Sequence, residues 1–311
     1  MKIKIECPQS FLDFREYTSA LSEMNLKLSE TDPEILIVNP GTRCKIDEEY
    51  LSKFKNLKII GTPSTGVNHI DLDYCDLKGI KVFSLLDNRP ALESITASAE
   101  FTWLHIMNAF RKFNRAIDPS KRFAWRGLGN ENRLRSNELS GKKIGIIGMG
   151  RIGRNIKRYA EAFRMNVKYF DPYSADLTLS GIPLASVQSL EDLRDVDVLS
   201  INCYLNDETE GMITDGFLES FDKFGKGLIV VNTSRGEVVD EEYISKHVLH
   251  NNIFYATDVI CNEQNQVRLA ESPLLRIQAD NLVISPHVAG ATIESQSKAF
   301  YGILQTCTES L

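Results

Sequence analysis

The sequence predicts an α/β protein built on doubly wound parallel sheets. Short apolar runs recur along the 311 residues and alternate with segments of helical periodicity, which is typical of parallel βαβ units. A glycine-rich turn, residues 148–153, stands between such a run and a helical segment. At about 100–200 residues per domain, the length favours two domains.

The first series of elements occupies the first third of the chain. The apolar runs that predict its strands are 2–7, 34–39, 57–62 and 80–85. Residues 47–54 have the pattern of a short helix, and residues 91–113 have that of a long one. Residues 118–139 are rich in Arg, Asn, Gly and Ser and lack periodicity, so we expect a loop or arm there. Within it, we expect Trp125 to dock on another surface, such as a second subunit.

A second series of elements begins at residue 143. Its predicted strands are 143–147, 167–170, 196–201, 228–232, 254–258 and 282–285. Residues 151–163 and 240–250 have helical patterns between these strands, and residues 292–311 have one after the last. Six strands with intervening helices predict a complete doubly wound sheet.

The composition argues against several classes of protein. Asp and Glu number 42 and Lys and Arg number 36, so an acidic chain without a dense basic run is not expected to bind nucleic acid. We expect no membrane span, because no apolar run reaches the roughly 18–20 residues needed. The six cysteines are scattered and the N-terminus lacks an apolar signal core, which predicts a cytoplasmic protein. We expect no metal, since His247 and His250 are three apart but lack a third ligand.

The turn at 148–153 has the pattern of a dinucleotide-binding loop. In Gly148-Met149-Gly150-Arg151-Ile152-Gly153, Gly148 permits the tight turn, Gly150 lets the backbone approach a pyrophosphate, and Gly153 lets the helix pack on the strand. Asp171 follows the next predicted strand, where an acid receives the ribose hydroxyls. A carboxylate there repels a 2′-phosphate, so the sequence predicts NAD rather than NADP.

Three later strands each lead to a polar side chain. Arg235 follows strand 228–232, Glu263 lies in the loop after strand 254–258, and His287 follows strand 282–285. Because ligands bind at the carboxyl ends of strands in such sheets, we expect the three side chains to converge on one crevice. Ser285 lies near His287 but lacks a nucleophile elbow, which argues against a hydrolase.

With these motifs in place, the sequence resembles the D-isomer-specific 2-hydroxyacid dehydrogenases over nearly its whole length. Besides the glycine loop, the resemblance rests on Leu139-Ser140-Gly141-Lys142, Glu208-Thr209-Glu210-Gly211, Asn232-Thr233-Ser234-Arg235-Gly236, Val239-Asp240-Glu241 and Ser285-Pro286-His287. It implies two Rossmann-like domains, with an NAD-binding domain at about 105–284 inserted into a flavodoxin-like substrate domain made of 1–104 and 285–311.

The resemblance also implies a catalytic triad of Arg235, Glu263 and His287. Hydride transfer to a 2-oxo acid leaves negative charge on the carbonyl oxygen, and a histidine that titrates near neutrality suits the delivery of a proton there. We therefore expect His287 to be the general acid in reduction and the base in oxidation. Glu263 would orient the imidazole and favour its cation. Arg235 would clamp the substrate carboxylate and keto oxygen.

Further ligand contacts follow from the same resemblance. The residues implied to contact NAD, besides the glycines and Asp171, are Arg151, Ile152, Cys203, Thr209, Thr233 and Asp258, the last beside the nicotinamide carboxamide. Backbone N–H groups of Thr65, Gly66 and Val67 are implied to hold the substrate carboxylate, and Arg43 is a candidate partner for a substrate phosphate. The family forms dimers through its nucleotide domains, so we expect a homodimer that uses residues 91–113 and the arm.

The sequence leaves the substrate open. D-3-phosphoglycerate and another small D-2-hydroxy acid are both compatible with it, although the chain ends too early for a C-terminal regulatory domain of the kind that many phosphoglycerate dehydrogenases carry. An alternative is an NAD-binding dimeric scaffold like the C-terminal-binding-protein corepressors, which keep the triad. Two stretches depart from the family pattern: Asn202-Cys203-Tyr204 replaces His-x-Pro, and Gln264 replaces a proline.

Overall fold

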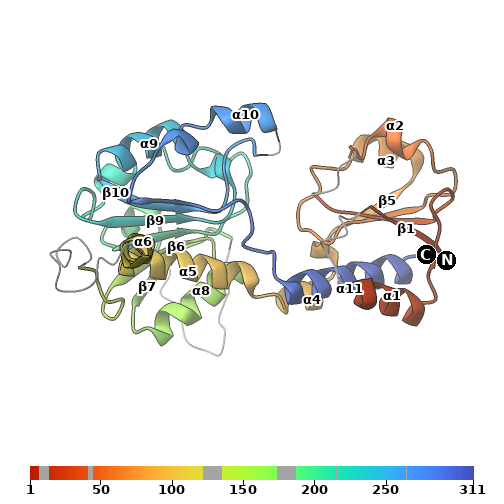
Figure 1. Ribbon diagram of the computed structural model, residues 1–311, viewed down its shortest axis with the longest axis horizontal. Helices are drawn as coiled ribbons and strands as arrows, with labels where there is room; N and C mark the ends of the chain where they lie inside the picture. Colours follow the sequence, from red (N-terminus) through yellow and green to blue (C-terminus); the bar gives the residue numbers. More distant parts are fainter. Residues whose placement is uncertain (7–13, 41–44, 122–134, 174–186, 215, 264) are drawn as a thin grey trace. The chain divides into compact units, whose positions relative to one another are not determined.

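The structure is a computed structural model that describes residues 1–6, 14–40, 45–121, 135–173, 187–214, 216–263 and 265–311. The chain divides into two compact units (Figure 1). One unit comprises Met1–Ala97 with Gly290–Leu311, and the other comprises Ser98–Ala289. The predicted ranges, 1–104 with 285–311 and 105–284, are close to these units, and their assignment to substrate and nucleotide remains a prediction. Among the helices of the described residues, none is both long and apolar enough to cross a membrane.

The first unit contains a five-stranded parallel sheet in the order β2-β1-β3-β4-β5. Its strands are β1 (Lys2–Glu6), β2 (Lys27–Leu28), β3 (Ile35–Val38), β4 (Ile59–Gly61) and β5 (Lys81–Phe83). Its helices are α1 (Phe14–Glu23), α2 (Glu48–Leu51), α3 (Leu72–Lys78), α4 (Arg89–Glu93) and α11 (Ile293–Glu309).

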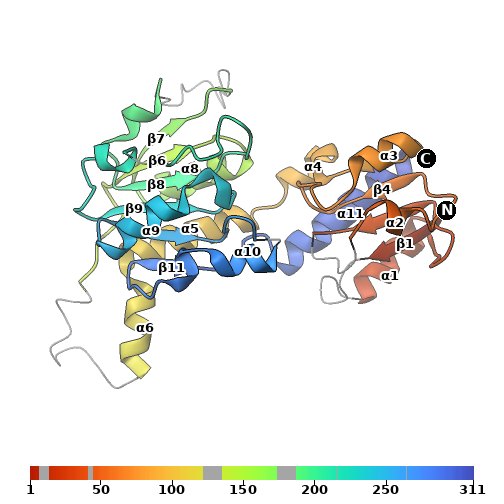
Figure 2. The ribbon, with the colours of Figure 1, turned by 90° about the horizontal axis from the view of Figure 1, so that it is seen from above.

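Alternation along the buried strand β3 gives this sheet two apolar faces. Ile35 and Ile37 pack in one cluster with side chains of α1 and α11, so the C-terminal helix covers the same face as the first helix (Figure 2). Leu36 and Val38 pack in another cluster, with side chains of α2 and α3 on the opposite face. Successive side chains of a strand point to opposite faces of its sheet, so a strand of a sheet that is covered on both faces is apolar at every position.

The second unit contains a six-stranded parallel sheet in the order β11-β10-β9-β8-β6-β7. Its strands are β6 (Lys143–Ile147), β7 (Asn166–Phe170), β8 (Val198–Ile201), β9 (Leu228–Asn232), β10 (Ile253–Thr257) and β11 (Leu282–Ile284). Its helices are α5 (Ala97–Arg111), α6 (Phe113–Lys121), α8 (Arg151–Ala162), α9 (Glu241–Leu249) and α10 (Gln266–Glu271). Short 3₁₀ turns of the two units are Leu85–Asp87, Leu190–Leu193, Leu218–Ser220, Gly236–Val238 and Leu274–Arg276.

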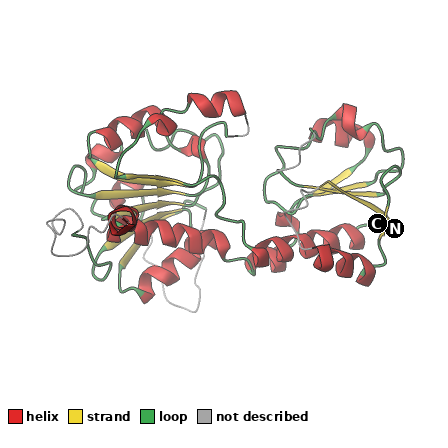
Figure 3. Ribbon diagram, viewed as in Figure 1, coloured by secondary structure: helices red, strands yellow, loops and turns green. Residues whose placement is uncertain are grey.

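Helices cover both faces of this second sheet as well (Figure 3). Side chains of α5 and α8 pack on one face, and those of α9 pack on the other. The chain passes from β6 to β7 on one side and then to β8 on the other, so the direction of winding reverses between β6 and β8. In open parallel sheets, that reversal places a crevice at the carboxyl ends of the strands. The predicted fold class, doubly wound parallel sheets, is confirmed.

Some predicted elements differ from the structure. The helix predicted at 91–113 is divided into α4 and α5, with residues 94–96 between them. The second part, α5, ends at Arg111, directly before Lys112, whose φ is +51°. The loop predicted at 118–139 was wrong at its start, because α6 continues to Lys121. Trp125 lies outside the described residues. The two-residue strand β2 was missed, since a run this short carries no periodicity.

Candidate active site

The glycine turn between β6 and α8 is held by close backbone contacts. Gly148 has a φ of +87°, and a Cβ added to it would lie 2.8 Å from the backbone of Asn202, after β8. A Cβ on Gly153 would lie 2.1 Å from the carbonyl oxygen of Gly148. By contrast, a Cβ on Gly150, which occupies the N-cap of α8, would meet no atom within 4 Å among the described residues outside its own stretch of chain. The two outer glycines therefore allow the turn to form, and the middle one leaves its backbone open to a ligand.

Asp171, directly after β7, joins this turn. Its Oδ2 accepts a hydrogen bond from the N–H of Met149 at 2.7 Å, and its Oδ1 accepts one from the N–H of Tyr173 at 2.9 Å. The acid that was predicted from spacing thus lies beside the glycine loop. Contact between this carboxylate and the ribose hydroxyls of NAD remains a prediction.

The segment after β9 fixes Arg235 through the buried Asn232. The Asn232 amide donates to the carbonyl oxygen of Arg235 at 2.9 Å, and its oxygen accepts from both the N–H and the hydroxyl of Ser234. A Cβ on Gly236 would lie 2.2 Å from the backbone of Ile260, so the loops after β9 and β10 are in direct contact. The Arg235 guanidinium donates to the carbonyl oxygen of Ser234 at 2.7 Å.

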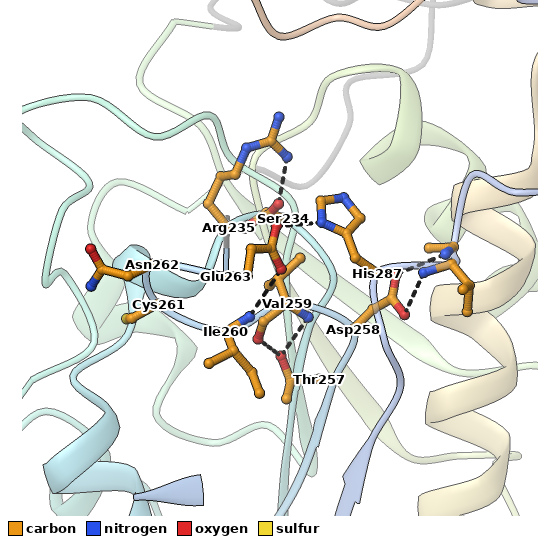
Figure 4. A network of polar contacts seen from close by, with 12 residues as sticks. Ser234, Arg235, Thr257, Asp258, Val259, Ile260, Cys261, Asn262, Glu263 and His287 are labelled. Carbon is orange, nitrogen blue, oxygen red and sulfur yellow. Dashed lines mark hydrogen bonds and ion pairs between the residues drawn. The ribbon is translucent and has the colours of Figure 1, made fainter. Parts of the chain in front are cut away.

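His287 and Glu263 form a hydrogen-bonded ion pair beside Arg235 (Figure 4). The bond joins Nδ1 of the imidazole to Oε1 of the carboxylate, and Oε2 of Glu263 also accepts from the N–H of Ile260. Because a carboxylate can only accept, Nδ1 carries the proton, and Nε2 remains to exchange one with a reactant. The His287 side chain is 51% exposed.

The pKa of His287 is raised above its ordinary value, chiefly by the hydrogen bond to Glu263. Burial of the ring lowers the pKa, the charges of Glu263 and Asp258 raise it further, and the charge of Arg235 lowers it. The net effect favours the imidazolium, the form that can donate a proton.

Asp258 holds the turn that carries His287. The residue is 1% exposed, and its carboxylate accepts from the hydroxyl of Ser285 at 2.5 Å and from the N–H groups of Val288 and Ala289 at 3.0 and 2.7 Å. Its carbonyl oxygen accepts from the N–H of His287 at 2.9 Å. His287 has a φ of +52°, an uncommon conformation for a residue with a Cβ, and these bonds hold it there. Contact between Asp258 and the nicotinamide remains a prediction.

The other residues predicted to contact NAD are engaged in local structure. Thr233 shares a hydrogen bond of 2.6 Å with Thr102 of α5, and the Thr209 hydroxyl donates to the carbonyl oxygen of Tyr204. Cys203 is half-buried after β8, and burial raises the pKa of its thiol to about 11. Their roles toward the cofactor remain predictions.

The predicted carboxylate-binding loop lies in the first unit, after β4. Thr65, Gly66 and Val67 are half-buried there, and the Ser64 hydroxyl donates to the carbonyl oxygen of Gly66 at 2.7 Å. The Ser64 hydroxyl is also bonded to that of the buried Thr62 at 2.9 Å. Arg43 and Gln264, which were also singled out, lie outside the described residues.

The sequence motifs included Asn232 and Ser285, but their roles as anchoring residues were missed. Asn232 is the last residue of the buried strand β9, and Ser285 directly follows the half-buried strand β11. Their positions at strand ends were the available signal, but their contacts depend on loops that meet only in the folded unit. Within the described parts of the chain, no three or more His, Cys, Asp or Glu side chains form a group that could hold a metal ion. His247 pairs with Glu219 at 3.1 Å, and His250 is bonded to the carbonyl oxygen of Lys246.

Most residues of this candidate site lie in a part of the chain that matches a known protein family. Residues 103–289 match the family model of the D-isomer specific 2-hydroxyacid dehydrogenase, NAD binding domain. The chain belongs to this family. The predicted family membership and the predicted cofactor, NAD, are therefore confirmed.

Relatives of several activities share this family. The chain is 32% identical to a D-3-phosphoglycerate dehydrogenase of Archaeoglobus fulgidus over 85% of its own length and 46% of the relative. It is 32% identical to a glyoxylate reductase of Thermofilum pendens, over 82% of this chain and 72% of that one. It therefore spans about half the length of the phosphoglycerate dehydrogenases that it matches.

A solved structure aligns over the entire chain. The D-lactate dehydrogenase of Aquifex aeolicus, complexed with NAD and lactic acid, is 26% identical, with a TM-score of 0.75 and coverage of 100% of this chain and 96% of that one. The glycine turn described above fits such a cofactor, because the backbone at Gly150 is open and a helix N-terminus favours phosphate. In this chain, NAD would be held by the turn at 148–153 and by Asp171.

Proposed function

We propose that this chain is an NAD-dependent dehydrogenase of a small D-2-hydroxy acid, with His287 as the general acid–base. The observation that carries the proposal is the Glu263–His287 ion pair beside Arg235, at the carboxyl ends of strands in an NAD-binding domain. The His287 imidazole has a raised pKa and an exposed side chain, and Nδ1 is already bonded to Glu263, so Nε2 is suited to exchange a proton with a substrate.

The mechanism follows from the side chains. The chemistry that NAD(H) supplies when bound is hydride transfer at C2 of the substrate. In reduction, Nε2 of His287 donates its proton to the carbonyl oxygen, which becomes the hydroxyl oxygen of the product. In oxidation, the neutral imidazole takes that proton back. Glu263 balances the positive charge on the ring in the protonated state.

Arg235 has the electrostatic role in this mechanism. Its guanidinium is planar and permanently charged, so it can bind the substrate carboxylate and stabilise charge that develops on the keto oxygen. The backbone of Asn232 through Gly236 is fixed by the bonds described above, which limits the arrangements that the guanidinium can adopt. The role of the Thr65, Gly66 and Val67 backbone N–H groups toward a substrate carboxylate stays a prediction from the resemblance.

The preferred substrate is the finer part of the proposal. We infer a 2-oxo acid of two or three carbons, because a glyoxylate reductase and a D-lactate dehydrogenase are among the relatives. The phosphoglycerate dehydrogenases among them make D-3-phosphoglycerate the second candidate.

A substrate panel tests this function. Purified protein is assayed with NADH and with NADPH against glyoxylate, pyruvate, hydroxypyruvate and phosphohydroxypyruvate. We expect turnover of about 1–1000 per second on at least one acid, with NADH preferred. Tight NADH binding without turnover on a broad panel would overturn the proposal and favour the scaffold function.

The His287→Gln variant tests the assignment of the general acid–base. Glutamine preserves much of the side chain's size and polarity but cannot exchange a proton near neutral pH. We expect kcat to fall by about 100–10,000-fold, as for the loss of a general acid. The Kd for NADH should remain within about twofold of wild type, and turnover near the wild-type rate would contradict the assignment.

We also propose a homodimer that uses the nucleotide domain. Large apolar side chains on α5 and α6 are exposed there, with Leu104 at 55% and Phe113 at 58%. Burying such side chains in a second copy would remove apolar surface from water. Sedimentation velocity at micromolar concentration should give the mass of two chains, and a mass of one chain would refute the dimer.

A further inference from the structure

His105 is a buried histidine that the proposed mechanism does not use. It lies on α5, is 4% exposed, and its ring meets that of Phe101 edge-on at 4.9 Å between centroids. Its Nε2 lies 3.1 Å from the hydroxyl oxygen of Ser285, two residues before His287. A buried polar ring must find hydrogen-bond partners, so this contact has structural weight.

The direction of that hydrogen bond can be deduced from the protons available. The Ser285 hydroxyl has one proton, and its two other neighbours, the Asp258 carboxylate at 2.5 Å and the Thr257 carbonyl oxygen at 3.4 Å, can only accept. The proton therefore goes to Asp258, the shorter contact. Ser285 can then only accept from His105, so Nε2 of His105 must carry a proton.

The charge state of His105 is consistent with this direction. Burial lowers the pKa of His105, while the charge of Asp258 partly opposes the shift. The ring is accordingly neutral near pH 7, with its single proton on Nε2. A continuous chain of donors then runs from His105 through Ser285 to the carboxylate of Asp258.

This series of hydrogen bonds ends at the turn that carries His287, the proposed general acid–base. The same Asp258 carboxylate accepts the N–H groups of Val288 and Ala289, which flank His287 on its C-terminal side. We propose that His105 is a positioning residue for His287, because its Nε2–H bond orients the Ser285 hydroxyl that holds Asp258 against this turn. The inference rests on the proposed role of His287 in proton transfer.

The pKa of His287 is the quantity to measure, because it depends on the hydrogen bond and the charges around the ring. Glu263 and Asp258 raise the pKa of His287 and Arg235 lowers it, with the hydrogen bond to Glu263 as the largest cause. That bond requires the turn to hold the imidazole in place. If the turn loosens, the bond forms for less of the time, and the pKa of His287 should fall toward the ordinary histidine value of about 6.5.

The test compares two substitutions of His105 in the full-length protein. His105→Leu removes the donor, whereas His105→Gln places an amide N–H near the position of Nε2. The titration of His287 is followed by NMR of its ring proton in the absence of substrate, and the signal is assigned with His287→Gln. We expect the His287 midpoint to fall in His105→Leu, with kcat about 10–100-fold lower and NADH affinity within about twofold of wild type. His105→Gln should restore both properties.

His247→Leu is the matched control. It also removes an imidazole from the second unit, but this ring is bonded to Glu219 and Asn252 rather than to the turn. The stability of the His247→Leu variant can change, whereas the midpoint of the His287 titration should not. Ser285→Ala should lower the midpoint as His105→Leu does, and the double variant should be no worse than Ser285→Ala alone, since both remove the same link.

Several outcomes would overturn the inference. An unchanged His287 midpoint in His105→Leu would do so, as would a His105→Gln variant as impaired as His105→Leu, because the ring would then act through packing alone. If His105→Leu does not fold, Ser285→Ala decides by the same measurement. A lack of turnover on every 2-oxo acid would refute the proposed function but not the positioning role, which the titration decides separately.

Discussion

The proton affinity of His287 depends mainly on one neighbour. Glu263 accepts a hydrogen bond from Nδ1–H, and this bond is the largest of the effects on the pKa of His287, with burial and the charge of Arg235 opposing it. In the proposed mechanism, reduction needs the imidazolium and oxidation needs the neutral ring. The raised pKa should therefore extend the pH range of reduction upward and shift the onset of oxidation to higher pH.

Glu263→Gln tests this dependence. The substitution keeps the size and the accepting oxygen of the side chain but removes its charge, so the pKa of His287 should fall. The alkaline limb of kcat/KM for reduction should move to lower pH, and the acidic limb for oxidation should move the same way. Profiles in both directions between about pH 5 and 10 measure these limbs. If both remain at their wild-type positions, Glu263 does not set the charge of the ring.

At the scale of elements, the β6–α8 turn separates the structural role of glycine from its ligand-binding role. Gly153 lies inside α8, where alanine is usually more stable than glycine by roughly 0.5–1 kcal/mol. Here the sign should reverse, because the added Cβ would lie 2.1 Å from a backbone oxygen of the same turn. Gly150 has a φ of −67° and space around its Cα, so alanine there should be tolerated.

The pair Gly153→Ala and Gly150→Ala gives a matched prediction. Gly153→Ala should lower the free energy of unfolding by about 1–3 kcal/mol, the usual cost of overpacking. Gly150→Ala should keep the wild-type melting temperature but bind NADH more weakly, because the methyl group occupies the approach to the backbone. Thermal melts and NADH fluorescence titrations distinguish the two effects. A Gly153→Ala protein as stable as wild type would show that the turn relaxes easily.

Elements with strong periodicity were predictable, and those fixed by local exceptions were not. The strands of the second sheet followed from apolar runs, whereas the separation of α4 from α5 and the left-handed Lys112 are not visible in an apolar pattern. The same holds at the site. Strand order predicted that Arg235, Glu263 and His287 would converge, and the family resemblance implied their catalytic roles, which remain predictions. The anchoring of Asp258 depends on groups 27–31 residues away in sequence, which only the folded sheet brings together.

At the scale of the molecule, the apolar interior follows the division into units. Five clusters of buried apolar side chains occur among the described residues, and each belongs to one unit: two to Ser98–Ala289 and three to the other. The chain passes between the units at Ala97–Ser98 and at Ala289–Gly290. Separate cores of this kind allow the units to unfold as separate cooperative steps.

Calorimetry with and without NADH tests that independence. We expect two transitions, of which only the one from the nucleotide-binding unit should rise with NADH. At a free concentration about 100 times Kd, binding adds about 2.7 kcal/mol of stability. For a unit of about 150–250 residues this shifts the midpoint by roughly 5–11 °C. The shift should shrink in Gly150→Ala, which identifies the transition. A single transition whose midpoint rises with NADH would instead mean that the two units unfold together. NADH bound to Ser98–Ala289 would then also stabilise the other unit.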